Sequence, residues 1–195
     1  MSLQELFLKL ADALDGPKPI EHAGATALRQ AAPQARPQTK STPLPPAVLK
    51  VMSAPDAHPV CALIAQTPFD WTPPHTSTDP AYIAHSTAKV HVELVGPEGL
   101  APSETVRLGL YGIGPNFEYG LRTHAAEEIF VMLAGEADWM RGDAPYAPLR
   151  TGGRAHHPFM LPHATRTGAE AFMSLYIWHG DVATSSYVYQ GLPKA

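Results

Sequence analysis

Cysteine is almost absent from this sequence of 195 residues, and other features that define common protein classes are absent as well. The one cysteine, Cys61, cannot form a disulfide within the chain, which fits a reducing compartment. Lys and Arg number 14 against 18 Asp and Glu, so the net charge is −4 and no basic surface favours nucleic acid. No stretch approaches the roughly 18 apolar residues of a membrane span, and the N-terminus lacks the pattern of a signal peptide. These absences predict a cytoplasmic protein with neither nucleic acid nor membrane as a partner.

The sequence motifs of nucleophile and nucleotide chemistry are also missing. The chain contains no Gly-x-Ser-x-Gly elbow, no phosphate-binding loop and no dinucleotide fingerprint. The remaining classes are metal chemistry and ligand binding.

The first part of the chain, residues 1–86, is helical and rich in proline. Helices are expected at residues 2–15, 20–31, 47–52 and 60–65. Ser2 and Glu5 form a capping box for the first of them. Prolines recur from Pro33 to Pro59 and exclude a long helix or a central strand there. Because apolar residues lie between these prolines, we expect residues 1–86 to pack as a layer on the rest of the domain and over its mouth.

From about residue 87 the apolar pattern changes to a period of two, which is typical of strands. Strands are expected at residues 89–95, 105–111, 119–123, 128–133, 137–140, 154–160, 171–179 and 186–190. Hydrophobic residues make up 45% of the chain, enough for the core of one domain. Seven or eight short strands predict an all-β barrel or sandwich over residues 87–195.

One segment within this region carries residues suited to a metal. His124 and Glu128 are separated by three residues at the start of an apolar run that leads to Gly135, where a turn is expected. Imidazole and carboxylate suit Zn²⁺, Mn²⁺ or non-haem iron. His163, which follows Pro162 in a loop stiffened by proline, is the best candidate for a third ligand. A surface helix pair would explain the His-x-x-x-Glu spacing equally well, but the strand and the later histidine favour a metal site.

The two segments resemble the paired motifs of the cupin superfamily, whose fold is a double-stranded β-barrel, or jelly roll. His124, Glu128 and Gly135 match the end of the first motif, and His163 loosely matches the second. Arg122 stands where the first motif has another histidine. The resemblance implies three protein ligands and open coordination positions, as in catalytic metal sites. Because cupins commonly dimerise, it also implies a homodimer.

Within the cupins, the chain is most similar to the dimethylsulfoniopropionate (DMSP) lyases of the DddQ type. These enzymes cleave DMSP to dimethyl sulfide and acrylate by β-elimination with a bound divalent metal. The resemblance implies one divalent transition metal, Zn, Fe or Mn, on His124, Glu128 and His163. It further implies Tyr119 as the catalytic base and Trp178 as an aromatic residue of the substrate pocket.

The chain departs from this family at Phe130, where the family usually has a tyrosine. Phenylalanine can neither bind a metal nor accept a proton. Tyr119 then carries the base role alone, or the chain is a relative with another substrate or with greatly reduced lyase activity. Under strict alternation Tyr119 and Arg122 face opposite ways, so bringing Tyr119 to the site requires a bulge, which Gly120 would allow. Arg122 fits either a surface ion pair or the binding of an anionic substrate group.

Aromatic residues offer a site for a substrate cation. Alternation places Phe172, Tyr176 and Trp178 on one face of their strand. If this face lines the barrel, Trp178 with Phe130 forms a cation-binding wall for a sulfonium; an aromatic stripe that simply fills the core is the alternative.

The sequence as a whole predicts a metal-dependent carbon–sulfur lyase acting on a small carboxylate, with DMSP as the first substrate to consider. Another metallocupin enzyme, an oxygenase or an isomerase, is a second hypothesis. A ligand-binding cupin without turnover is a third.

Overall fold

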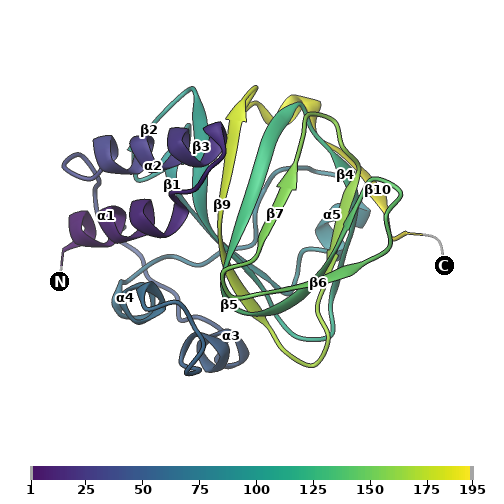
Figure 1. Ribbon diagram of the computed structural model, residues 1–195, viewed down its shortest axis with the longest axis horizontal. Helices are drawn as coiled ribbons and strands as arrows, with labels where there is room; N and C mark the ends of the chain where they lie inside the picture. The colour runs from purple at the N-terminus through teal and green to yellow at the C-terminus, as the bar shows by residue number, and fades with distance from the viewer. Residues whose placement is uncertain (1, 194–195) are drawn as a thin grey trace.

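The computed structural model of the protein describes residues 2–193. Met1 and residues 194–195, which close the predicted 87–195 region, lie outside the described residues. In the described part of the chain, the helices between residues 3 and 66 lie on one side of a β-barrel, and a short helix at residues 80–84 lies on the other side (Figure 1). Within residues 2–193 no helix has both the length and the apolar character needed to cross a membrane.

The helices begin and end close to the residues that the sequence predicts. They are α1 (Leu3–Leu14), α2 (Pro19–Ala31), α3 (Pro46–Met52), α4 (Val60–Gln66) and α5 (Pro80–Ala84). The hydroxyl of Ser2 accepts a hydrogen bond from the backbone N–H of Glu5 at 3.2 Å, which confirms the predicted N-cap of α1. Helix α5 was not predicted from the sequence; the carboxylate of Asp79 caps it by accepting two backbone N–H bonds.

Between residues 2 and 193, ten strands form the barrel, two or three more than the sequence predicts. They are β1 (Lys89–Gly96), β2 (Ala101–Pro102), β3 (Val106–Ile113), β4 (Glu118–Thr123), β5 (Ala126–Arg141), β6 (Ala147–Arg150), β7 (Arg154–His157), β8 (His163–Arg166), β9 (Phe172–Gly180) and β10 (Val188–Gly191). The helix-side sheet contains β2, β1, β3, β9, β5 and β7, and the far sheet contains β10, β4, β8, β5 and β6. The cupin-type double-stranded barrel with an N-terminal helical layer is therefore confirmed.

Strand β5 joins the two sheets, and here the prediction of a turn at Gly135 was wrong. The segments expected as two strands form one strand of 16 residues. Gly135 has φ of 73°, a conformation that favours glycine, and the register with β9 shifts between Met132 and Ala134. This irregularity bends β5 instead of ending it. The first half of β5 then pairs with β9 and β7, and the second half with β6 and β8.

Proline explains most of the other differences from the prediction. The strand expected at residues 154–160 ends at His157, because Pro158 has no N–H to donate to the ladder. Strand β6 contains Pro148 and lies at the edge of the far sheet, where a proline is tolerated. His163 was expected in a loop, but it begins β8 directly after Pro162.

The helix-side sheet has two different faces. Helices α2, α3 and α4 pack on its outer face and bury the aliphatic side chains of β9, namely Met173, Leu175 and Ile177. The side chains of Phe172, Tyr176 and Trp178 point to the barrel interior, as alternation predicts. The helical layer is also tied to the barrel by an ion pair between Arg154 of β7 and the buried Glu21 of α2.

Candidate metal centre and cavity

Three predicted ligands meet inside the barrel. His124 follows β4, Glu128 lies on β5 and His163 begins β8, and all three are at most 3% exposed. One ligand atom from each lies within 4.8 Å of the other two. The Nε2 atoms of His124 and His163 lie 3.5 and 3.1 Å from Oε2 of Glu128. The three residues that the sequence predicts as ligands of one metal therefore lie together.

The hydrogen bonds of the two histidines leave their Nε2 atoms available to a metal. Nδ1 of His124 donates to the carbonyl of Ala126 at 3.0 Å, and Nδ1 of His163 donates to the carbonyl of Leu161 at 2.8 Å. Because a carbonyl only accepts, each Nδ1 carries the proton and each Nε2 presents a lone pair. Neither Nε2 has a hydrogen-bond partner among the described residues. Three buried acceptors that face one another repel unless a cation joins them, so the site fits a divalent metal.

Glu128 is held by side chains from the two neighbouring strands. The indole Nε1–H of Trp178 on β9 donates to Oε1 at 2.6 Å, and Nδ1 of His157 on β7 donates to Oε2 at 2.9 Å. Burial raises the pKa of the Glu128 carboxyl, but the neighbouring His124 and the hydrogen bond from His157 outweigh burial and hold this pKa well below its usual range. The carboxylate is therefore ionised at neutral pH and ready to act as a ligand.

The two supporting residues also fix the histidine rings. Trp178 stacks on His124 with 4.2 Å between ring centroids, and His157 stacks on His163 with 4.1 Å. Trp178 was predicted only as part of the substrate pocket. Its contacts with Glu128 and His124 add a role in orienting the metal ligands.

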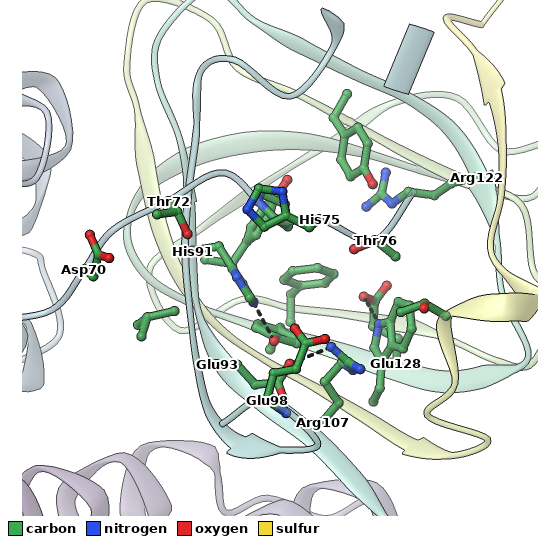
Figure 2. A pocket seen from close by; sticks show the side chains of 18 of the residues that line it. Asp70, Thr72, His75, Thr76, His91, Glu93, Glu98, Arg107, Arg122 and Glu128 are labelled. Carbon is green, nitrogen blue, oxygen red and sulfur yellow. Dashed lines mark hydrogen bonds and ion pairs between the residues drawn. The ribbon is translucent and has the colours of Figure 1, made fainter. Parts of the chain in front are cut away.

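A cavity of about 210 Å³ opens beside Glu128. It is smaller than the roughly 300–1,000 Å³ typical of drug-sized ligands, which favours a small molecule. The remaining predicted site residues, Tyr119, Arg122, Phe130 and Trp178, all line this cavity. Figure 2 shows Arg122 on the opposite side of the cavity from Glu93, Glu98 and Arg107, with Glu128 between them in this view.

Tyr119 reaches the cavity because the strand is irregular beside it. The register of β4 with β8 shifts between Tyr119 and Arg122, at the glycine where the sequence predicts a bulge. As a result Tyr119 and Arg122 are both buried, and Cζ of Arg122 lies 4.1 Å from the centroid of the Tyr119 ring. Nζ of Lys89 lies 2.9 Å from the same centroid. The phenol ring therefore contacts two basic side chains.

The Tyr119 hydroxyl is hydrogen-bonded to the hydroxyl of Tyr187. Burial is the largest cause that raises the pKa of Tyr119 well above its ordinary value; Tyr187 adds to this rise, and Arg122 lowers the pKa only in part. Tyr119 is thus mostly a neutral phenol at neutral pH.

The opposite side of the cavity holds polar residues that the sequence did not single out for the site. Glu93 forms an ion pair with Arg107 at 2.6 Å and accepts the backbone N–H of Glu98 at 2.9 Å. Nε2 of His91 lies 2.7 Å from the Tyr176 hydroxyl (Figure 2). Burial lowers the pKa of His91 to about 3, so this imidazole is neutral.

The sequence did not assign His157, Lys89 or His91 to the site; these residues reach the interior through strand pairing. The register places His157 opposite Glu128 and His91 opposite Tyr111. A signal existed for His157, because it follows His156 and only one of two adjacent strand residues can face inward. His156 instead pairs with Glu127 at 2.7 Å nearer the surface.

A family model described as dimethylsulfoniopropionate lyase matches residues 25–174. Among curated proteins, dimethylsulfoniopropionate lyase DddQ from Ruegeria pomeroyi (strain DSS-3) is 36% identical over 92 residues, which are 47% of this chain and 46% of that protein. The matched stretch therefore spans less than half of the relative's length.

Two solved structures resemble the whole chain. A chain from the crystal structures of the DMSP lyases RdDddP and RnDddQII has a TM-score of 0.68 at 23% identity, over 96% of this chain and 95% of that one. The crystal structure of DMSP lyase DddQ from Ruegeria pomeroyi DSS-3 has a TM-score of 0.64 at 26% identity, over 96% of both chains. Because the sequence identity to the first structure is only 23%, that similarity shows a shared fold and nothing more.

Proposed function

The chain belongs to the DMSP lyase family, and from that premise we propose that it cleaves DMSP to dimethyl sulfide and acrylate by β-elimination. One divalent transition metal, Zn, Fe or Mn, is held in this proposal by His124, Glu128 and His163. The observation that carries the proposal is the convergence of three buried acceptors, two of them unpartnered imidazole nitrogens and the third, Glu128, in the lining of a small cavity.

The reaction places specific demands on the residues around the substrate. A proton next to a carboxylate is weakly acidic, because its removal puts a second negative charge beside the first. A divalent metal in this centre would supply the Lewis-acid stabilisation of that charge. Arg122 adds a positive charge to the lining of the cavity and is assigned to substrate binding in this proposal.

Tyr119 is proposed as the base that removes the proton from the carbon next to the carboxylate. The electron pair of that C–H bond forms the new double bond of acrylate, and the bond from the next carbon to sulfur breaks with its pair leaving on dimethyl sulfide. Because the pKa of Tyr119 is raised by burial, only a small share of it is ionised at neutral pH. Arg122 favours that phenolate.

The sulfonium end of DMSP requires surroundings that attract a soft cation. Phe130 and Trp178 line the cavity, and aromatic faces attract cations within about 6 Å. Phe130 packs against Trp139 at 4.7 Å between centroids, so its ring is fixed in place. We assign these two rings to the sulfonium group.

We also propose that residues 1–86 and 87–195 act as a packed layer and a barrel, and that the protein is a cytoplasmic homodimer. The dimer rests on the cupin resemblance. Light scattering coupled to gel filtration distinguishes a dimer from a monomer.

One observation favours a different metallocupin enzyme. The Tyr119 hydroxyl is already bonded to Tyr187, and Phe130 offers no hydroxyl as a replacement base. An oxygenase would not need a base at this position. Oxygen consumption with an iron-loaded sample would support that alternative.

The experiment for the proposed function is release of dimethyl sulfide from DMSP by purified protein, with acrylate and metal content measured on the same sample. We expect the two products in equal amounts and no release after His124→Ala. A fully metal-loaded protein that forms neither product would refute the proposal.

A further inference from the structure

Tyr111 on β3 places a hydroxyl inside the cavity without a partner. The side chain is 5% exposed, and its oxygen makes no hydrogen bond with any described residue. The ring is held edge-on against Phe130 at 5.6 Å and tilted against Phe172 at 6.1 Å between centroids. A buried hydroxyl without a partner destabilises the protein, so a ligand that bonds to it recovers free energy.

Arg122 is a second buried donor that is not fully satisfied. It is 2% exposed and lies within 4 Å of no carboxylate among the described residues. Its hydrogen bonds go to three neutral oxygens at 3.3 to 3.5 Å, which are long for a guanidinium. An arginine with a buried, uncompensated charge is a strong site for an anion.

The two buried carboxylates of the cavity, Glu93 and Glu128, already have partners. Glu128 accepts from Trp178 and His157, and the charge of Arg107 is paired with Glu93 although its Nε has no partner. The hydroxyl of Tyr176 is bonded to His91. Tyr111 and Arg122 are therefore two buried donors without a charged partner that line the same cavity.

We propose that Tyr111 and Arg122 together form a receptor for the carboxylate of a small aliphatic acid. Arg122 supplies the charge, and the Tyr111 hydroxyl supplies one directed hydrogen bond. The receptor rests on the proposed function only for the identity of the acid. Burial raises the pKa of Tyr111 well above its ordinary value and outweighs the lowering by Arg122, so the phenol keeps the proton that it donates.

The test uses full-length protein treated with a chelator, so that binding does not depend on a metal. Acrylate is titrated into wild type and into Tyr111→Phe, and binding is followed by calorimetry. We expect binding to the variant to be about tenfold weaker, as for loss of one hydrogen bond to a charged group. The melting temperature should stay equal or rise, because the variant loses an unpartnered buried hydroxyl. A merely structural role for Tyr111 predicts a lower melting temperature instead.

Tyr146→Phe is the matched control. Its hydroxyl donates to Glu118 at 2.8 Å outside the cavity, so acrylate binding should match wild type. Equal acrylate affinity in Tyr111→Phe and wild type, or no acrylate binding by metal-free wild type, would overturn the receptor. Acrylate binding that depends on Tyr111 in a protein that never releases dimethyl sulfide would support the receptor while the proposed function fails. Dimethyl sulfide release with the same KM for DMSP in Tyr111→Phe and in wild type would overturn the receptor while the proposed function stands.

Discussion

The outer and inner faces of the helix-side sheet are made by the same strands but differ in chemistry. On β9 the outward side chains are aliphatic and wholly buried beneath the helices, as Leu175 and Ile177 illustrate. The inward side chains Tyr176 and Trp178 contact His91 and Glu128 through polar atoms. Alternate residues of one strand thus lie in two different environments.

The difference indicates a division of labour between the two faces. An aliphatic face excludes water and contributes stability in proportion to the area it buries. The inner face buries ionisable groups at a cost that only hydrogen bonds, ion pairs or ligands offset. We therefore expect substitutions on the outer face to change stability and substitutions on the inner face to change metal binding or turnover.

The largest effect should come from Glu128→Gln on the inner face. An amide cannot supply the negative charge of this ligand, so metal content should fall and dimethyl sulfide release should drop by about three orders of magnitude. Elemental analysis and gas chromatography measure the two quantities. Glu127→Gln is the control, because Glu127 pairs with His156 away from the centre. If Glu128→Gln kept its metal and its rate, the three-ligand centre would be wrong.

Tyr119→Phe should lower turnover by about 10², the lower end of what a general base contributes, while leaving metal content unchanged. In wild type the raised pKa of Tyr119 also predicts the pH profile. The active form is the phenolate, so the rate should increase about tenfold per pH unit and show no plateau below pH 10, the ordinary tyrosine pKa. A rate that levels off near neutral pH would mean that another group removes the proton.

Leu175→Ala tests the outer face. Removing a fully buried leucine should lower the free energy of unfolding by about 2–5 kcal/mol, measured by denaturant titration. Turnover per folded molecule should match that of wild type. If Leu175→Ala stayed fully folded but lost much of its turnover, the two faces would not have separate roles.

Trp178→Phe should give the smallest of these effects. The variant keeps an aromatic ring beside His124 but loses the N–H that donates to Glu128. We expect metal affinity to fall about 10- to 100-fold, as measured by competition with a chelator. Unchanged affinity would assign Trp178 to the substrate alone.

Much of the fold was predictable from local patterns. Helical spacing and the Ser2 cap predicted α1, and alternation predicted the two faces of β9. The single long strand β5 was not predicted, because Gly135 has the composition of a turn, while its real role depends on the pairing of β5 with two sheets. Strand β8 was not predicted, because Pro158 and Pro162 indicate a loop that continues up to the first residue of this strand.

The site was predictable only in part for a related reason. Sequence spacing and resemblance identified His124, Glu128 and His163. The support of Glu128 by His157 depends on the register of β7 against β5, which no local pattern encodes. The unpartnered Tyr111 hydroxyl is likewise visible only once β3 is placed beside the other strands.

The central claim is that a metal on His124, Glu128 and His163 enables cleavage of DMSP, and stepwise metal restoration tests it most directly. Chelator-treated protein is titrated with Zn²⁺, Fe²⁺ or Mn²⁺ while dimethyl sulfide release is recorded. We expect no dimethyl sulfide release without metal and, with the productive metal, a rate of release that rises linearly and saturates at one equivalent of metal per chain. Full release from metal-free protein, or none with any of the three metals at one equivalent, would contradict it.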